Sequence, residues 1–170
     1  KALMREILRS ETYQRSSVPV AGNATETRYY ARYYPRRLMA EVILDAYSQV
    51  TDVPTEFTRL TGNGDTTTLE YPTGTRALQL PDSQIASYFL KNFGKPDRVQ
   101  TCECERTAEP SVAQVLHIAN GSTLNDKLRT DRSRISQLWK SAGTDSRDVV
   151  GAWIEEAYLA AFARLPTETE

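Results

Sequence analysis

The sequence is poor in the residues that most often carry catalysis or covalent cross-links. Its 170 residues include two cysteines and one histidine. Two cysteines are too few for a disulfide framework, and any serine–histidine–aspartate triad would have to use His117 as its base. The sequence also contains no Gly-rich phosphate loop, no GxSxG, no HExxH and no DxDxDG loop. These gaps argue against the common classes of enzyme that such motifs mark.

The sequence has neither a long apolar run nor an excess of one charge. Lysine and arginine total 21 and aspartate and glutamate total 22, which gives a net charge of -1. No apolar run approaches the roughly 18 residues that indicate a membrane span. Near-neutral charge excludes a strongly basic nucleic-acid-binding domain. We therefore expect no nucleic acid partner and no membrane span in this chain.

Apolar residues recur at helical spacing along most of the chain, which predicts a mainly α protein. Leu3, Met4, Ile7 and Leu8 place an apolar face on a helix over residues 1–14, and we interpret this helix as the end of a longer one. The chain is therefore expected to be a fragment of a larger protein. Similar spacing, with Ser, Thr, Asp, Pro and Gly as start and stop signals, predicts further helices over about 35–50, 82–93, 110–120, 122–131, 135–142 and 145–165.

Residues 51–80 differ from the rest of the chain in composition. They hold Pro54, Pro72 and the tract TGNGDTTT at 61–68, and Pro81 follows directly, so a helix is not expected. A short hairpin with arms at 57–60 and 68–71 is one option. We therefore predict a single helical domain over 1–170, an irregular multi-helix fold with a loop-rich insert at about 51–80 and room for a short β ribbon.

The first candidate site is the segment Cys102-Glu103-Cys104 together with His117. Side chains at i and i+2 share one face of an extended backbone, so both thiolates can reach one metal ion. With the imidazole they would suit zinc or copper. Two alternatives stay open for the cysteines, because Cys102 and Cys104 can be small buried residues or, if the backbone bends, a disulfide. His117 can equally be a hydrogen-bonded residue at the core boundary.

The second candidate site is a segment in which arginines alternate with tyrosines. Such side chains stack on sugar rings and bind phosphate or sulfate through paired hydrogen bonds, which makes a glycan-binding surface one hypothesis. The competing interpretation packs the tyrosines under the next helix and pairs the arginines with acids such as Glu41 and Asp45. We name this the tyrosine–arginine segment, and its residues are Arg28, Tyr29, Tyr30, Arg32, Tyr33, Tyr34 and Arg36.

Several blocks of the sequence, taken together, resemble one family. They are similar to the planctomycete-specific domain of unknown function called PSD-one, which lies near the C-terminus of large bacterial proteins with a cytochrome-c-like domain. The blocks follow the family's order and correspond to the C-terminal two-thirds of that domain. They are SETYQ (10–14), YAR (30–32), PRRL (35–38), EVILDA (41–46), QLPD (79–82), FGKP (93–96), CECER (102–106), PSVAQVLH (110–117) and YLAAFARLPT (158–167).

The resemblance implies an exported, periplasmic or cell-envelope protein. It implies haem in a neighbouring domain of the parent protein, whereas this chain has no CxxCH motif and no cofactor is expected in it. It supplies no activity and no catalytic residues. Our leading hypothesis is a non-catalytic helical interaction or structural module that contacts other domains of its parent or a protein partner. The alternatives are a metal- or redox-supported site, enzymatic or not, at Cys102, Cys104 and His117, and glycan binding at the tyrosine–arginine segment.

Overall fold

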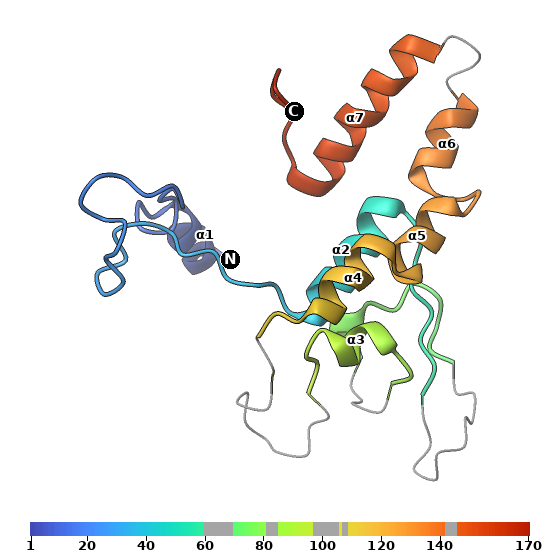
Figure 1. The fold of residues 1–170 in the computed structure, drawn as a ribbon, viewed down its shortest axis with the longest axis horizontal. Helices are drawn as coiled ribbons and strands as arrows, with labels where there is room; N and C mark the ends of the chain where they lie inside the picture. The colour runs from blue at the N-terminus through green and yellow to red at the C-terminus, as the bar shows by residue number, and fades with distance from the viewer. Residues whose placement is uncertain (60–69, 81–84, 97–105, 107–108, 142–145) are drawn as a thin grey trace. The chain divides into compact units, whose positions relative to one another are not determined.

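The computed structural model describes residues 1–59, 70–80, 85–96, 106, 109–141 and 146–170. These residues are mainly helical, which confirms the predicted class (Figure 1). The chain divides into two compact units, Lys1–Arg37 and Leu38–Glu170, and each is described by itself. The single domain expected from the sequence stays a prediction.

The first unit contains one short helix, α1 (Ala2–Arg9). The helix is shorter than the expected 1–14, because the N–H of Ser10 and its hydroxyl both turn back to the Ile7 carbonyl, at 3.1 and 2.8 Å. Beyond it the unit consists of turns, tied by the Tyr33 N–H to the Ser16 carbonyl at 3.0 Å. None of residues 1–37 is buried. This unit therefore has a helix with an apolar face but no core of its own.

The second unit is arranged around one helix, α2, which contacts most of the other helical elements of the unit. In the loop-rich stretch predicted after it, the helical structure among the described residues is a single 3-10 turn, η1. The helical elements are α2 (Ala40–Thr51), η1 (Ala77–Gln79), α3 (Tyr88–Asn92), α4 (Val112–Asn120), α5 (Ser122–Arg129), α6 (Arg134–Ser141) and α7 (Ser146–Phe162).

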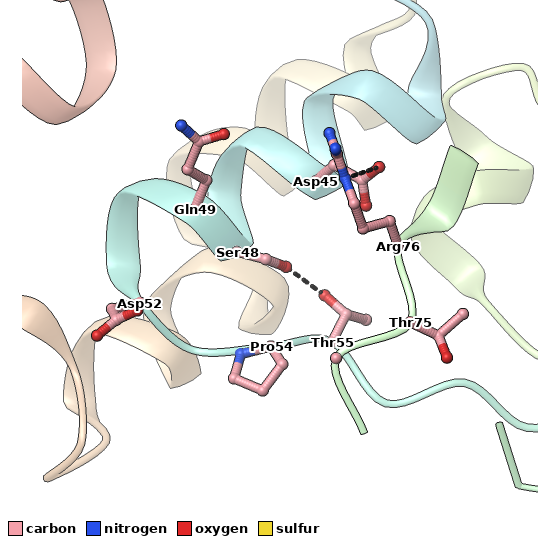
Figure 2. A pocket seen from close by; sticks show the side chains of 9 residues that line it. Asp45, Ser48, Gln49, Asp52, Pro54, Thr55, Thr75 and Arg76 are labelled. Atoms are coloured by element: carbon pink, nitrogen blue, oxygen red, sulfur yellow. Dashed lines mark hydrogen bonds and ion pairs between the residues drawn. The ribbon is translucent and has the colours of Figure 1, made fainter. Parts of the chain in front are cut away.

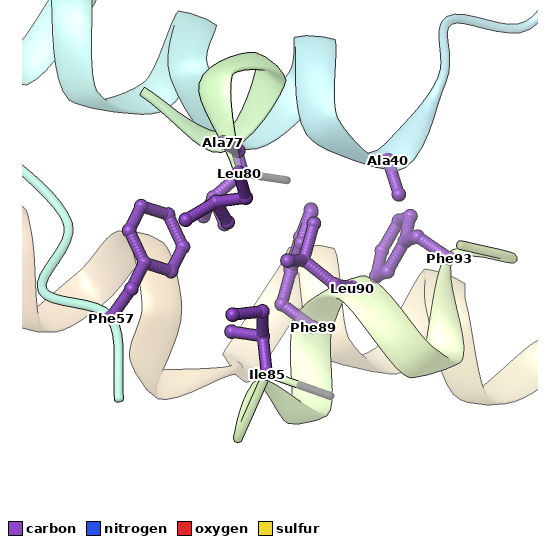
Figure 3. Packing of buried hydrophobic residues seen from close by; sticks show 9 residues of the cluster. Ala40, Phe57, Ala77, Leu80, Ile85, Phe89, Leu90 and Phe93 are labelled. Atoms are coloured by element: carbon purple, nitrogen blue, oxygen red, sulfur yellow. The ribbon is translucent and has the colours of Figure 1, made fainter. Parts of the chain in front are cut away.

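The core lies where α2, η1 and α3 meet (Figure 3). Leu44 and Leu90 are almost completely buried, at 1% and 2% exposure. Phe89 and Phe93 stack with ring centroids 4.1 Å apart, and Tyr47 meets Phe89 edge-on at 5.8 Å. Burial of such side chains is the main favourable term in folding. The full cluster is Ala40, Leu44, Phe57, Ala77, Leu80, Ile85, Phe89, Leu90 and Phe93.

Two helices begin later than their sequence patterns predict. Helix α2 starts at Ala40 and not near Pro35, because Met39 is extended and the fully buried Ala40 is the first residue held against the core. Helix α3 starts at Tyr88 and not at 82 or 83. Ile85 pairs with Arg59 in an isolated antiparallel bridge, which keeps the chain extended as far as the cap at Ser87. Tertiary pairing has overridden the helical spacing at both sites.

The predicted β ribbon is reduced to isolated pairing in the described residues. An antiparallel bridge joins Thr58 to Glu70, and the Tyr71 N–H donates to the Phe57 carbonyl at 3.1 Å. These residues belong to the two arms expected at 57–60 and 68–71. Residues 60–69, between the arms, lie outside the described residues.

The link between α4 and α5 depends on glycine. A Cβ on Gly121 would lie 2.3 Å from the His117 carbonyl oxygen and 2.7 Å from its Nδ1. The Gly121 N–H donates to that same carbonyl at 2.8 Å, and α5 begins at the next residue. Only glycine fits this close approach, and the two helices are thereby held in direct succession.

Helix α4 begins with a reciprocal cap whose loss should be measurable. The Ser111 Oγ accepts from the Gln114 N–H at 3.3 Å, and the Gln114 Oε1 accepts from the Ser111 N–H at 3.1 Å. We expect Ser111→Ala to lower the free energy of unfolding by about 1 kcal/mol. Ser122→Ala is the matched control, since Ser122 makes no cap bond, and it should change stability by less than about 0.5 kcal/mol. Equal urea midpoints for the two variants would refute the capping role.

Candidate functional site

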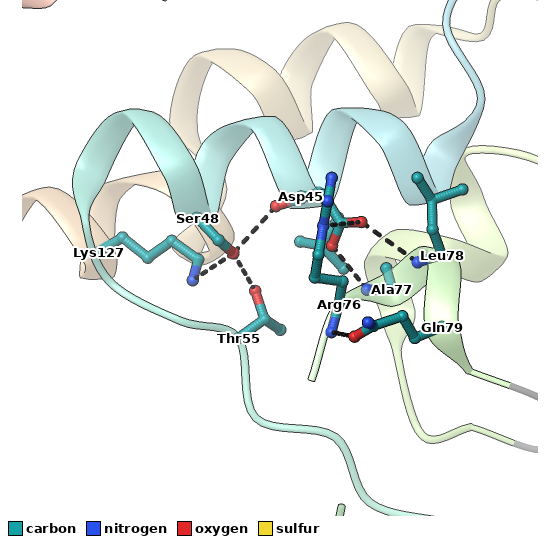
Figure 4. A network of polar contacts seen from close by, with 9 residues as sticks. Asp45, Ser48, Thr55, Arg76, Ala77, Leu78, Gln79 and Lys127 are labelled. Atoms are coloured by element: carbon teal, nitrogen blue, oxygen red, sulfur yellow. Dashed lines mark hydrogen bonds and ion pairs between the residues drawn. The ribbon is translucent and has the colours of Figure 1, made fainter. Parts of the chain in front are cut away.

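Among the described residues of the second unit, Lys127 is notable because it is a buried lysine. It stands on α5, is 7% exposed, and its Nζ donates to the Val53 carbonyl at 2.6 Å and to the Ser48 Oγ at 3.3 Å (Figure 4). Val53 lies just beyond the end of α2, where carbonyls lack helical partners and a positive charge is favoured. The Ser48 hydroxyl is fixed in turn by Thr55 Oγ1 at 2.9 Å and by the Leu44 carbonyl at 3.1 Å.

The same end of α2 receives a second cation, Arg134. Its Nε donates to the Val50 carbonyl at 3.0 Å and a terminal nitrogen to the Gln49 carbonyl at 3.2 Å, while the other terminal nitrogen contacts Glu156 at 2.7 Å. Helix α2 has no basic residue in its own last turn. Two distant residues therefore supply the charge that the helix end favours, and one of them also ties α6 to α7.

Burial changes the acid–base behaviour of Lys127. Removal of the amine from water lowers its pKa to about 8, and the nearby negative charge of Glu56 acts in the opposite direction. Desolvation disfavours the charged form, and this accounts for the direction of the change. A substantial share of neutral amine is therefore present at mildly alkaline pH.

Lys127 lines a pocket of about 540 Å³ that is bounded by residues 53–56, residues 86–89, α4 and α5. One part of its wall is aromatic, since Tyr88 and Phe89 each lie 5.6 Å from the His117 ring, centroid to centroid. The charged groups on its lining are Lys127, Glu56, Asp126 and Arg132. The pocket thus combines an apolar, ring-bearing wall with a few ionisable side chains, as small-molecule sites commonly do.

A second, smaller pocket of about 350 Å³ shares Thr55 with the first and is also lined by Ser48 (Figure 2). The buried carboxylate at its edge, Asp45, accepts hydrogen bonds from the Ala77 N–H at 2.6 Å and the Leu78 N–H at 3.2 Å. The partly exposed Arg76 approaches the same carboxylate at 3.6 Å. Asp45 therefore anchors η1 to α2. Because its carboxylate already has these partners, it is less available to a ligand in this pocket than Lys127 is in the first.

His117 is a hydrogen-bonded residue at the boundary of the core. Its Nε2 lies 2.8 Å from the Thr123 Oγ1, and its ring packs near Phe93 at 6.0 Å in addition to Tyr88 and Phe89. This agrees with the second interpretation given for it above. Cys102 and Cys104 lie outside the described residues, so the metal site and the disulfide both stay predictions.

The tyrosine–arginine segment is largely exposed. Tyr29, Tyr30 and Tyr33 are 74%, 59% and 50% exposed. Tyr34 is partly buried, since its hydroxyl donates to the Glu26 carbonyl and the Arg32 guanidinium lies over its ring, 4.4 Å from the centroid.

The acids proposed as partners for the segment's arginines have other partners. Glu41 binds Arg106, and Asp45 binds the backbone of η1 together with Arg76. The exposed rings leave the segment available for contact, as the leading hypothesis requires.

Comparison with known families identifies the family of the chain. A family model described as "PSD1: Protein of unknown function (DUF1553)" matches residues 1–170, the whole chain. The chain belongs to the PSD1 family. This confirms the resemblance drawn from its sequence blocks. No curated protein and no solved structure matches the PSD1 chain. The family description names no activity, so a function for the chain has to be inferred from the geometry of its sites.

A bidentate ion pair of the PSD1 chain joins residues far apart in its sequence. Two nitrogens of Arg106 contact the two carboxylate oxygens of Glu41, at 2.8 and 3.1 Å, and Glu41 on α2 is 7% exposed. Burial alone would raise the pKa of Glu41, but the hydrogen bonds and charge of Arg106 outweigh it and hold the pKa below its ordinary value. No local pattern in the sequence indicates this pair, because its two residues lie 65 positions apart.

Apolar side chains also remain exposed on the PSD1 chain's later helices. Within the described residues no helix is long and apolar enough to cross a membrane. The exposed apolar positions on α4 fall on neighbouring turns. On α6, Trp139 is exposed, and its ring centroid lies 4.9 Å from that of Trp153 on α7. The α4 residues are Val112, Val115, Leu116 and Ile118.

Proposed function

We propose that this PSD1 chain is a non-catalytic interaction module that contacts another domain of its parent polypeptide through the first unit. The observation that carries the proposal is the lack of any buried residue in Lys1–Arg37. A unit this short without a core has little to stabilise it, because domains below about 40 residues usually need disulfides, metals or a partner. An isolated helix of the length of α1 is marginal in water.

The exposed residues of the first unit have the chemistry of a protein contact. On α1 they are Leu3, Met4, Ile7 and Leu8, which share one face of the helix and are 71%, 65%, 50% and 48% exposed. Tyrosine and arginine, which dominate the tyrosine–arginine segment, are the residue types most enriched at the energetic centres of interfaces. A partner that covers both features would gain apolar burial and ring contacts together.

The family resemblance extends this proposal to the setting of the protein. We infer an exported, periplasmic or cell-envelope bacterial protein, in which the covering domain belongs to the same chain as a cytochrome-c-like domain that holds the haem. A surface of exposed tyrosines also fits a glycan, which is the second candidate function. The two candidates differ in that glycan binding does not require the apolar face of α1.

Amide hydrogen exchange tests the docking proposal. We expect the amides of α1 to exchange rapidly in the isolated chain and at least about tenfold more slowly in the parent polypeptide, because a buried isoleucine contributes more than the 1.4 kcal/mol that a factor of ten requires. Ile7→Ser should remove most of this protection. Arg9→Ser, on the opposite face of α1, is the matched control and should retain it. Equally fast exchange of α1 in both contexts would contradict the proposal.

A further inference from the structure

The geometry points to a second activity in the second unit, independent of docking. We propose that the pocket beside Lys127 admits a small aldehyde or ketone, and that the Lys127 amine captures its carbonyl carbon as a Schiff base. The hydrogen bonds of the amine, the pocket that Lys127 lines and the groups around that pocket support this proposal. Nothing in it depends on the first unit, so either proposal can fail without the other.

The amine is held in the arrangement that a nucleophile needs. Among the described residues, the Lys127 Nζ has two acceptors, the Val53 carbonyl at 2.6 Å and the Ser48 Oγ at 3.3 Å. The hydroxyl hydrogen of Ser48 is directed to the Leu44 carbonyl at 3.1 Å, which leaves its oxygen free to accept. A neutral amine has two N–H groups and one lone pair. The two acceptors match the two hydrogens, and the lone pair remains for an electrophile.

The pocket has the size and lining of a small-molecule site. Its volume of about 540 Å³ lies within the range of about 300–1,000 Å³ found for ligand pockets. Leu44, Phe89 and the ring of His117 line it, and they suit an apolar or aromatic group on the carbonyl compound. Glu56 and Asp126, also on the lining, are acids able to exchange the protons of the reaction with solvent.

The reaction is balanced without a further reactant. The lone pair of the neutral Lys127 amine forms a C–N bond to the carbonyl carbon as the π electrons move to oxygen. The oxygen gains a proton and the nitrogen loses one, which gives a carbinolamine. A second protonation of that hydroxyl lets it leave as water while the nitrogen lone pair forms the C=N bond. Glu56 and Asp126 are the carboxyl groups of the lining that can take part in these transfers, and one water is released for each carbonyl captured.

The acid–base properties of the site favour this chemistry. Burial lowers the pKa of Lys127 to about 8, partly opposed by Glu56. At pH 8 about half of such an amine is neutral, whereas under about 1% of an ordinary lysine with a pKa near 10.4 is. The groups that face the amine or line the pocket beside it are Glu56, Tyr88, His117, Asp126 and Arg132, together with the hydroxyls of Ser48 and Thr55.

Reductive trapping tests the proposal on the intact chain. The folded protein is incubated at pH 8 with benzaldehyde and cyanoborohydride, and labelled ε-amines are mapped by peptide mass spectrometry. We expect Lys127 to be labelled at least about tenfold faster than Lys91, which is exposed on α3, because its neutral fraction is larger. Labelling that follows exposure, with Lys127 unmodified while the exposed lysines react, would overturn the proposal.

Two further experiments distinguish binding in the pocket from a general reactivity of the Lys127 amine. An aldehyde carried on a dextran too large for the pocket should fail to label Lys127 while it still labels Lys91. Lys91→Met should leave the rate at Lys127 unchanged. Because the labelling map of the wild-type chain decides the question, the test does not require a variant of Lys127 that folds. Equal labelling of Lys127 by the small and the dextran-bound aldehyde would exclude the pocket as the binding site.

Discussion

The Phe89→Ala variant is expected to lose about 3–5 kcal/mol of the free energy of unfolding, the range for aromatic truncation in a packed core. Phe89 is 3% exposed and stacks on Phe93 with ring centroids 4.1 Å apart. It also meets Tyr47 and His117 from other helices, at 5.8 and 5.6 Å. Removal of its ring leaves a cavity that three elements border, and none of them can close it without moving the others.

Urea denaturation followed by circular dichroism measures this loss. Tyr88→Ala is the matched control, because Tyr88 is an aromatic residue on the same helix that is 69% exposed. Its loss should be well under half of that for Phe89→Ala, since an exposed ring gives up little burial. If both variants lost the same amount, α3 would act as a surface helix and the core would be wrongly placed.

The Arg106→Met variant is expected to lose about 3 kcal/mol, because it leaves the carboxylate of Glu41 buried without its charged partner. Methionine keeps most of the length and the apolar contacts of the arginine stem. The double variant Glu41→Leu/Arg106→Met should recover most of the loss, because it removes both buried charges. A double variant as unstable as the single one would show that packing of the arginine stem, and not the ion pair, is responsible.

The same pair predicts a dependence on pH. The pKa of Glu41 is lowered in the folded chain, so its ion pair stabilises the fold above the unfolded pKa, and this contribution is lost as pH falls through the folded value. In Arg106→Met the unpaired Glu41 destabilises the fold only while it is charged. The difference in stability between wild type and variant should therefore be constant near neutral pH and begin to shrink above about pH 4, because burial without Arg106 raises the pKa of Glu41 in the variant. A constant difference down to pH 2 would contradict the assignment.

Local patterns in the sequence predict the helices well and their first residues less well. The succession of α4 and α5 around Gly121 follows from capping and spacing alone. The starts of α2 and α3 do not, because the burial of Ala40 and the pairing of Ile85 with Arg59 depend on residues distant in the sequence. Such contacts leave no periodic signal.

The candidate site was harder to predict than the fold. Lys127 reads as a solvated charge in STLNDKLRTD, although its spacing from Leu124 places it on the apolar side of α5 and is the one local sign of burial. Its acceptor, the Val53 carbonyl, belongs to the end of α2, and no residue type marks that carbonyl in advance. Glu41 and Arg106 are equally remote from each other. In the sequence the candidate site is predicted from the rare residues cysteine and histidine, whereas the buried ionic groups are lysine, glutamate and arginine, which are common.

The order of the core along the chain bears on how the protein is made. Among the described residues, every buried hydrophobic side chain lies between Ala40 and Phe93. Translation adds about 5–20 residues per second, so N-terminal segments are available for folding first. The ribosome therefore completes the apolar nucleus several seconds before it finishes α7. The later helices can then condense onto an existing template during biosynthesis, and a truncated nascent chain would still contain the whole nucleus.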